Sequence, residues 1–276
     1  MKQPDKGLKD WRPFREAHSI DRAVIGLVFA QKVTDVPFDK IMKVSRDVTQ
    51  KLGQFAEHQI HEVSVEVSAG AAKKGPTTNE GLEFAIHSAP AAVSEKITVR
   101  RDRILLETWA YTRWQPFVDR ARVLIERLLP LYAASVPILG VSVEYFDKFV
   151  ATVEEPKINE VLKKGDFLVG QAFSEDFPWH SRAGWFDKTD EITLCLTNLD
   201  VSVGETTTEE GATRRVINIR SMMRDTFGMN GMRRPTEEEV TPQVVAERFD
   251  ELHIRIKGLL EGLLTDASID RIALKE

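Results

Sequence analysis

Several features that the sequence lacks narrow the class of protein. Cys195 is the single cysteine, so no disulfide can form within the chain, and a reducing cytoplasm is the expected compartment. No apolar run reaches the roughly 18 residues that a membrane-spanning helix needs. The first residues carry lysines with no apolar stretch behind them, which is not the pattern of a secretory leader. We therefore expect a cytoplasmic protein with no membrane contact.

The motifs of the common nucleotide, zinc and serine chemistries are also missing. The chain has no Walker-type loop, no G-x-G-x-x-G, no H-E-x-x-H, no C-x-x-C and no G-x-S-x-G. His58 and His61 are three residues apart, but they fall where a predicted helix gives way to a strand, which spoils the geometry for a metal. We predict no metal site and no cofactor. The absence of these motifs also argues against an enzyme of these classes.

The composition is that of a globular protein without a strong charge bias. Of the 276 residues, 42% are hydrophobic and 29% are charged, and the formal net charge is −5. This length supports one large domain or two small ones. The negative net charge argues against a chain that binds polyanions over its whole surface.

Hydrophobic periodicity predicts an α+β fold. Helical spacing occurs in three segments, at 37–52, 115–134 and 242–264, with Pro37, Pro116 and Pro242 near their first turns. Short or alternating apolar runs predict strands at 22–30, 60–68, 82–88, 92–100, 103–110, 138–150, 166–173, 191–203 and 215–222. Hairpin strands interrupted by single helices are typical of antiparallel α+β sheets.

Three details of this assignment carry specific expectations. The polar stretch 70–81 is expected to be a long loop. The alternation within 191–203 changes phase by one residue, which predicts a β-bulge near Thr197-Asn198. The polar tip 204–213 then joins two strands into a long hairpin.

The order of elements suggests an arm followed by two halves. We expect an irregular N-terminal arm at 1–19, a first half at 20–136 and a second half at 137–276, with one continuous domain as the alternative. Pro137 is the one obvious joint. The two halves are candidates for related α/β units, although no residue-level repeat is visible.

The C-terminal helix has the clearest pattern. Its apolar residues repeat at steps of four and three, which is the spacing of a coiled-coil seam: Val245, Phe249, Leu252, Ile256, Leu259 and Leu263. One reading is a core helix lying on a sheet. The other is a helix–helix seam through which the 242–264 helix forms a homodimer or larger homo-oligomer.

The segment 176–186 is a candidate ligand site on a predicted loop. Trp179 and Trp185 could stack on a ligand or a nucleobase, or simply pin the loop to the core. The weak catalytic candidates are Asp176, His180 and Arg182 from this segment, with His253 from the last helix.

The segment 214–234 combines positive charge with methionines. It holds six arginines against one acid, Asp225, so its net charge is +5, and it holds four of the six methionines. Arginines bind carboxylate or phosphate, and methionines offer an adaptable apolar surface. The predicted partner-binding residues are Arg214, Arg215, Arg220, Met222, Met223, Arg224, Met229, Met232, Arg233 and Arg234. The alternative is an arginine-lined strand whose methionines fill the core.

The run ETWAYTRWQPF at 107–117 carries a family resemblance. It resembles the ET-x-x-Y-T-x-W-x-x-F segment of a sporadically distributed family of uncharacterised bacterial proteins of similar length. The segments 23–29 and 140–147 and the terminal helix with Glu251-Leu252-His253 agree with it. The family's usual arginine before the tyrosine is absent here, because Glu144 precedes Tyr145.

The resemblance implies a bacterial or phage origin and no assigned reaction. A patchy distribution is typical of genes on mobile elements, such as defence, anti-defence and toxin–antitoxin genes. The leading hypothesis is therefore a non-enzymatic protein-interaction or regulatory module with a protein partner. The alternatives are an enzyme with a cleft near 176–186 and a nucleic-acid binder that uses the basic segment 214–234.

Overall fold

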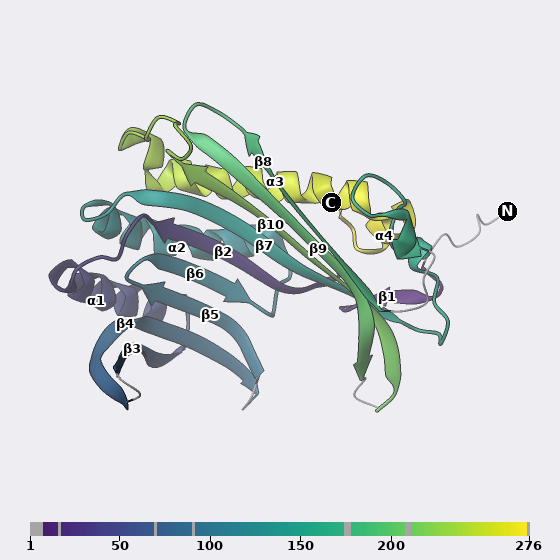
Figure 1. Ribbon diagram of the computed structural model, residues 1–276, viewed down its shortest axis with the longest axis horizontal. Helices are drawn as coiled ribbons and strands as arrows, with labels where there is room; N and C mark the ends of the chain where they lie inside the picture. The colour runs from purple at the N-terminus through teal and green to yellow at the C-terminus, as the bar shows by residue number, and fades with distance from the viewer. Residues whose placement is uncertain are drawn as a thin grey trace. The chain divides into compact units, whose positions relative to one another are not determined.

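A computed structural model describes residues 8–15, 18–68, 71–89, 92–173, 178–207 and 211–274, and only the backbone of residues 64–68 and 71–76. Within these ranges the chain forms a large antiparallel sheet covered by helices, which confirms the α+β prediction (Figure 1). No helix among them is both long and apolar enough to cross a membrane.

The elements follow one another along the chain with short connections. The first half contains β1 (Trp11–Pro13), β2 (Ile20–Phe29), α1 (Asp35–Leu52), β3 (Ala56–Ser68), β4 (Ala71–Ala89), β5 (Ala92–Arg100), β6 (Arg103–Thr108) and α2 (Trp114–Ala133). The second half contains β7 (Ile138–Ala151), η1 (Ile158–Glu160), η2 (Gly170–Phe173), β8 (Trp179–Lys188), β9 (Thr193–Thr207), β10 (Thr213–Phe227), η3 (Glu238–Val240), α3 (Pro242–Leu263) and α4 (Asp266–Arg271).

The sheet repeats one topology in the two halves. Its strand order is β3-β4-β5-β6-β2-β7-β10-β9-β8, with β1 pairing with β7 outside this path. In the first half, β2 is followed by the meander β3–β6, and β6 lies beside β2. In the second half, β7 is followed by the meander β8–β10, and β10 lies beside β7. A helix, α2 or α3, then follows the meander.

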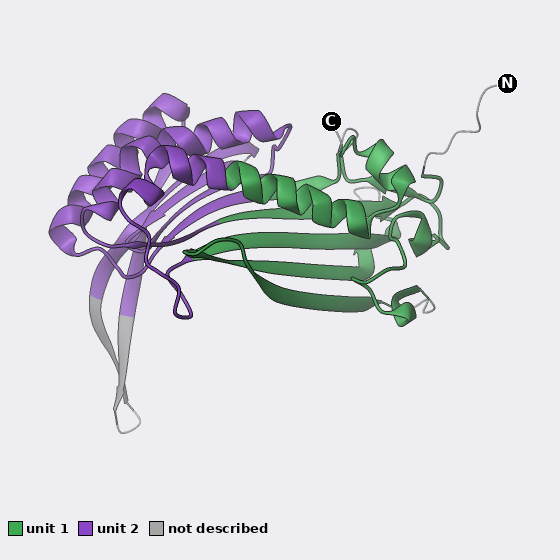
Figure 2. Cartoon of the chain, turned by 90° about the horizontal axis from the view of Figure 1, so that it is seen from above, with its two compact units in different colours: residues 1–23, 142–226, 249–276 green, residues 24–141, 227–248 purple. Residues whose placement is uncertain are grey.

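Residue contacts divide the chain into two compact units (Figure 2). Unit 1 contains residues 1–23, 142–226 and 249–276, and unit 2 contains residues 24–141 and 227–248. The division is discontinuous along the chain, because β2, β7, β10 and α3 each run from one unit into the other. The predicted boundaries at residues 19 and 136 lie close to two of these crossings.

The core of unit 2 lies between α1, α2 and one face of its strands. Phe38 and Ile41 of α1 and Leu128 of α2 are fully buried, as the helical spacing predicted. They are covered by alternating strand residues such as Leu82 and Ile97. The run at 107–117 supplies a corner here, because Phe117 makes edge-to-face contacts with both Tyr111 and Trp114.

The core of unit 1 lies between its strands and the unit 1 part of α3. All six residues of the predicted seam in this helix are buried within the chain. Thr241 caps its N-terminus, accepting a hydrogen bond from the Val244 amide at 3.3 Å. The core-helix reading is therefore confirmed, and any contact between subunits through 242–264 would have to use other faces of α3, such as the exposed Ile254.

The predicted loop at 70–81 is wrong, because β4 runs through it from Ala71 to Ala89. β4 pairs with β3 along its length, with register shifts that absorb the irregular sequence near Ile60 and Val63. A long ribbon tolerates a polar sequence because neither of its faces has to be apolar throughout. Gly81 is required for a close approach, since a Cβ there would lie 2.3 Å from the Val99 carbonyl oxygen.

The predicted bulge at Thr197-Asn198 is also wrong. β9 keeps one register with β8 and alternates without a slip. Thr193 and Thr197 occupy the buried face where the pattern led us to expect apolar residues, and the buried Cys195 lies between them. The polar side chains on the inner face therefore produced the false change of phase. The predicted hairpin is present, since β9 and β10 are neighbours in the sheet.

Three further segments differ from the sequence assignment. Residues 179–186 form most of β8 instead of a loop, while 174–177 lie outside the described residues. The strand expected at 166–173 is replaced by the short helix η2. The N-terminal arm, expected to be irregular, contains β1, in which Trp11 is buried, whereas Phe14 just after it is exposed.

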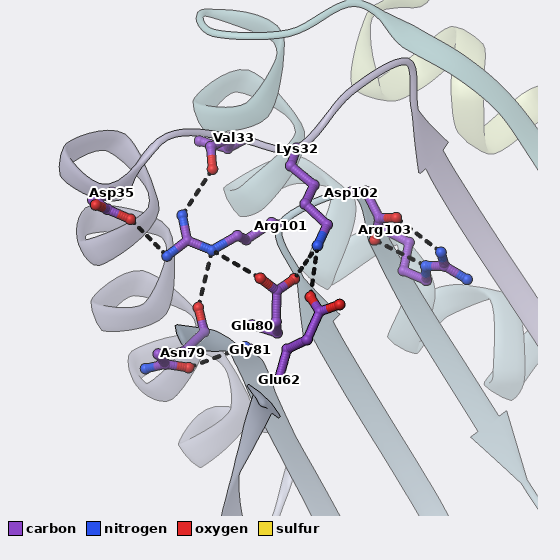
Figure 3. Close-up of polar contacts among 10 residues, drawn as sticks. All are labelled: Lys32, Val33, Asp35, Glu62, Asn79, Glu80, Gly81, Arg101, Asp102 and Arg103. Carbon is purple, nitrogen blue, oxygen red and sulfur yellow. Dashed lines mark hydrogen bonds and ion pairs between the residues drawn. The ribbon is translucent and has the colours of Figure 1, made fainter. Parts of the chain in front are cut away.

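A buried ion network fastens the start of α1 to the strands of unit 2 (Figure 3). Arg101 is 8% exposed and donates hydrogen bonds to the carbonyl oxygens of Val33 and Asn79, each at 2.9 Å. It also pairs with Asp35 at 2.8 Å and approaches Glu80 at 3.8 Å. These contacts tie the α1 entry, the end of the β3–β4 ribbon and the β5–β6 turn to one side chain.

Candidate functional site

The weak catalytic candidates do not form one site. His180 and Arg182 lie on the exposed face of β8, where Arg182 pairs with Asp200 of β9 at 2.7 Å. His253 lies on α3, half-buried, and its Nδ1 is 2.9 Å from the Tyr145 hydroxyl. Asp176 lies outside the described residues.

The two histidines lie on opposite faces of the unit 1 strands. His180 is paired with Ser202 of β9, while the adjacent Val201 and Val203 are buried on the face that α3 covers. Tyr145, the partner of His253, is buried on the α3 side of β7. No proton can pass directly between His180 and His253, because the sheet separates them.

Trp179 and Trp185, which were expected to stack on a ligand, lie on the face of β8 opposite to His180 and Arg182. Both tryptophans are half-buried and alternate with these two residues along the strand. The Trp185 ring stacks on Phe167, with ring centroids 6.1 Å apart. This placement gives no support to base stacking at these two positions.

The arginine and methionine residues of 214–234 are divided between the two units. Residues 214–224 belong to unit 1, and 229–234 belong to unit 2. Met222 and Met223 are buried, as the core-filling alternative expected, and Arg220 forms an ion pair with Glu144. Met229, Met232, Arg233 and Arg234 remain at least partly exposed in the loop after β10.

A small cavity of about 50 Å³ lies in unit 1 around Asp147. The Asp147 carboxylate is 3% exposed and accepts a hydrogen bond from Ser19 at 2.6 Å. Burial raises its pKa from 3.8 to about 6. His253 lines the same cavity, and burial, together with the nearby Lys257, lowers its pKa to about 4.

A cavity with a volume of about 510 Å³ lies within unit 2. Its wall combines the C-terminal turn of α2, the first residues of β7, the end of β2 and the loop after β10. The apolar lining includes Leu129, Ala133, Val136, Pro137, Ile138, Phe227, Met229 and Val240. Small-molecule and side-chain sites in proteins have volumes of this order and a similar apolar character.

An ion-pair clamp fixes the loop that closes this cavity. Arg233 donates two hydrogen bonds to the Glu239 carboxylate, at 2.9 and 2.6 Å, and the Thr236 amide donates a third at 2.8 Å. Together these donors lower the pKa of Glu239 to about 2. The turn also uses left-handed backbone at Gly228 and Gly231, with φ of 64° and 79°.

The clamp leaves the neighbouring Arg234 at the wall of the cavity. A Cβ on Gly228 would lie 3.2 Å from Arg234 Cγ, so the glycine lets the arginine stem pack against the turn. Among the described residues, Arg234 makes no ion pair, and Glu237 is the acidic residue that shares the lining. The site therefore offers an apolar volume beside an available guanidinium.

The sequence identified only part of this site. Met229, Arg233 and Arg234 belong to the segment that the sequence singled out, and they lie at or beside the cavity. Ala133, Val136 and Pro137 were missed because their spacing is that of an ordinary helix end. A pattern within one segment cannot show that three distant stretches of the chain line one cavity.

Comparison with known proteins adds no relative to this picture. The chain matches no protein-family model and no curated protein sequence. In the part of the chain that the structure describes, no group of three or more His, Cys, Asp or Glu side chains is placed to hold a metal ion.

Proposed function

We propose that this chain is a non-enzymatic protein-interaction or regulatory module that holds a peptide segment of a protein partner in the unit 2 cavity. The observation that carries the proposal is a mostly apolar volume of about 510 Å³ with Arg234 on its wall and a fixed closing loop. We also propose a bacterial or phage origin and a role in a defence, anti-defence or toxin–antitoxin system. This part of the proposal rests on the family resemblance alone.

The chemistry of the cavity selects the class of peptide. An apolar side chain gains free energy by leaving water for the apolar lining. A neighbouring Asp or Glu can pair with Arg234, which is not neutralised by the described residues. We therefore expect an acidic-hydrophobic segment that places its apolar residue inside and its carboxylate toward Arg234.

A random peptide library displayed on phage tests this expectation directly. The expected result is enrichment of peptides with an apolar residue next to Asp or Glu, and binding of a synthetic copy measured by calorimetry. Arg234→Glu should weaken that binding by about tenfold or more, because a like charge replaces the attraction. Ala133→Trp should abolish binding, because the indole fills the cavity.

Two matched variants separate these effects from damage to the fold. Ala134→Trp adds the same ring at the next, exposed position, which does not line the cavity, and should bind normally. Glu237→Gln removes the acidic residue of the lining and should leave binding unchanged or stronger. A library that enriches basic peptides or no consensus, or binding that Ala133→Trp leaves intact, contradicts the proposal.

A further inference from the structure

β8 ends the sheet, so one of its two backbone edges has no neighbouring strand among the described residues. In the strand order it pairs with β9 alone, through ten consecutive residue pairs without a register shift. The strand contains no proline and no bulge from Trp179 to Lys188. Its outer edge therefore presents a regular row of amide and carbonyl groups to any other strand.

The opposite end of the sheet is protected in the ways that natural edges usually are. β3 has register shifts at Ile60/His61 and Val63/Val65, which interrupt a regular edge. Its exposed acids Glu57 and Glu62 are held in ion pairs with Arg46 and Lys32. A second strand would pair poorly with such an edge. β8 also carries charged side chains, but its register has no shift, and this difference points to pairing at β8.

We propose that β8 pairs antiparallel with β8 of a second copy of this chain, centred on Gly184, so that the two sheets continue into one. A two-fold axis perpendicular to the sheet keeps each face continuous and closes both edges at once. Each residue of β8 in one copy then lies opposite a residue of the other copy on the same face of the sheet. The two residues of such a pair lie equally many positions before and after Gly184.

This register is self-complementary in its side chains. Arg182 of one copy lies opposite Phe186 of the other, and the contact occurs twice. Phe186 is 61% exposed, and Arg182 is exposed while it pairs with Asp200, so both are available on this face. A guanidinium over an aromatic ring is attractive. Centring the pair on Arg182 would instead bring two like charges together.

The occupant is a second copy because the complementary groups belong to the same strand. A partner strand must supply an aromatic residue opposite Arg182 and a cation opposite Phe186, four residues apart, and β8 itself supplies both in the correct order when it is antiparallel. Gly184 at the axis adds no side chain to the contact. The proposal is independent of the peptide cavity in unit 2.

Sedimentation equilibrium of the full chain tests the pairing. The expected mass is twice 31.3 kDa at tens of micromolar protein. Phe186→Lys should raise the dimer dissociation constant by about tenfold or more, because it places a cation opposite Arg182 at both contacts. Adding Arg182→Glu together with Asp200→Lys to that variant should restore the dimer. Each pair between the copies becomes oppositely charged, and the ion pair between β8 and β9 is kept with its charges exchanged.

The control is a second strongly exposed apolar residue of unit 1. Ile254 of α3 is 66% exposed, and Ile254→Lys should leave the dimer unchanged. A monomeric natural chain, a dimer that Phe186→Lys leaves intact, a failed rescue by Arg182→Glu with Asp200→Lys, or dissociation by Ile254→Lys would each overturn the proposal. Circular dichroism of every variant shows that the fold is retained.

Discussion

Replacing Arg101 with methionine should lower the free energy of unfolding by about 3–5 kcal/mol, the usual cost of removing one partner of a buried ion pair. The neighbouring replacement, Arg103→Met, should cost less than about 1 kcal/mol, because its pair with Asp102 is a partly exposed contact between adjacent residues. Urea unfolding at neutral pH, followed by tryptophan fluorescence, measures both values.

The difference follows from what each arginine leaves behind. Without Arg101, the carbonyl oxygens of Val33 and Asn79 lose the hydrogen bonds that its guanidinium donates. Glu80, which is 3% exposed, keeps its ion pair with Lys32 at 2.9 Å. Methionine retains much of the volume of the side chain, so little of the loss comes from packing, although the contact of the guanidinium with the Phe38 ring is removed.

A double variant identifies the buried charge as the cause. Adding Glu80→Gln to Arg101→Met should recover part of the loss, because a neutral amide costs less to bury than an unpaired carboxylate. Equal stability changes for Arg101→Met and Arg103→Met, or a double variant no more stable than Arg101→Met, would show that the network in Figure 3 does not hold α1 in place.

Local periodicity predicted the parts of the fold in which one stretch of sequence decides the structure. The seam of α3 and the apolar face of α1 could be read directly, because an amphipathic helix needs its apolar residues at helical spacing. The same rule failed at β9, where Thr193 and Thr197 face the core. A buried hydroxyl looks like a surface residue in any pattern of hydrophobicity.

The site and the ion network depend on long-range contacts that no local pattern contains. Arg101 lies between the predicted strands 92–100 and 103–110, and nothing near it showed that its side chain would reach residues 66 and 68 positions away. The basic segment 214–234 stands out in the sequence, but its residues are divided between the two units, since unit 2 resumes at Phe227 at the end of β10. The sequence showed the composition of the segment, and the fold determined which residues share a surface.

Asp147→Asn should stabilise the protein by about 1–3 kcal/mol above pH 7 and have little effect below pH 4. Burial raises the pKa of Asp147 from 3.8 to about 6, so the folded chain retains a proton that the unfolded chain has already released. The contribution of this carboxyl to stability is therefore full below pH 3.8 and is lost as the pH rises through 6. The rise in pKa corresponds to about 3 kcal/mol, less the cost of burying a new amide N–H.

His253 determines how the free energy of unfolding of Asp147→Asn depends on pH. Its pKa is lowered to about 4, so the unfolded chain takes up the proton first as the pH falls, and stability is lost between about pH 6.5 and 4. In the natural chain, the protein gains stability as Asp147 takes up its proton with falling pH. This gain opposes the loss from His253 over the same pH range. Asp147→Asn should remove the opposition and leave stability falling steadily toward pH 4.

Chemical unfolding at several pH values tests both parts of this expectation. Asp21→Asn is the matched control, since Asp21 is a partly exposed carboxylate of the same unit that pairs with Lys148 at 2.9 Å, and its loss should cost less than about 1 kcal/mol. A natural chain whose stability rises between pH 4 and 6 as steeply as that of Asp147→Asn would mean that Asp147 ionises in the folded state at its ordinary pKa. The Ser19 contact at 2.6 Å would then be strong enough to offset burial, and the arm before β2 would be held by a charged hydrogen bond instead of a neutral one.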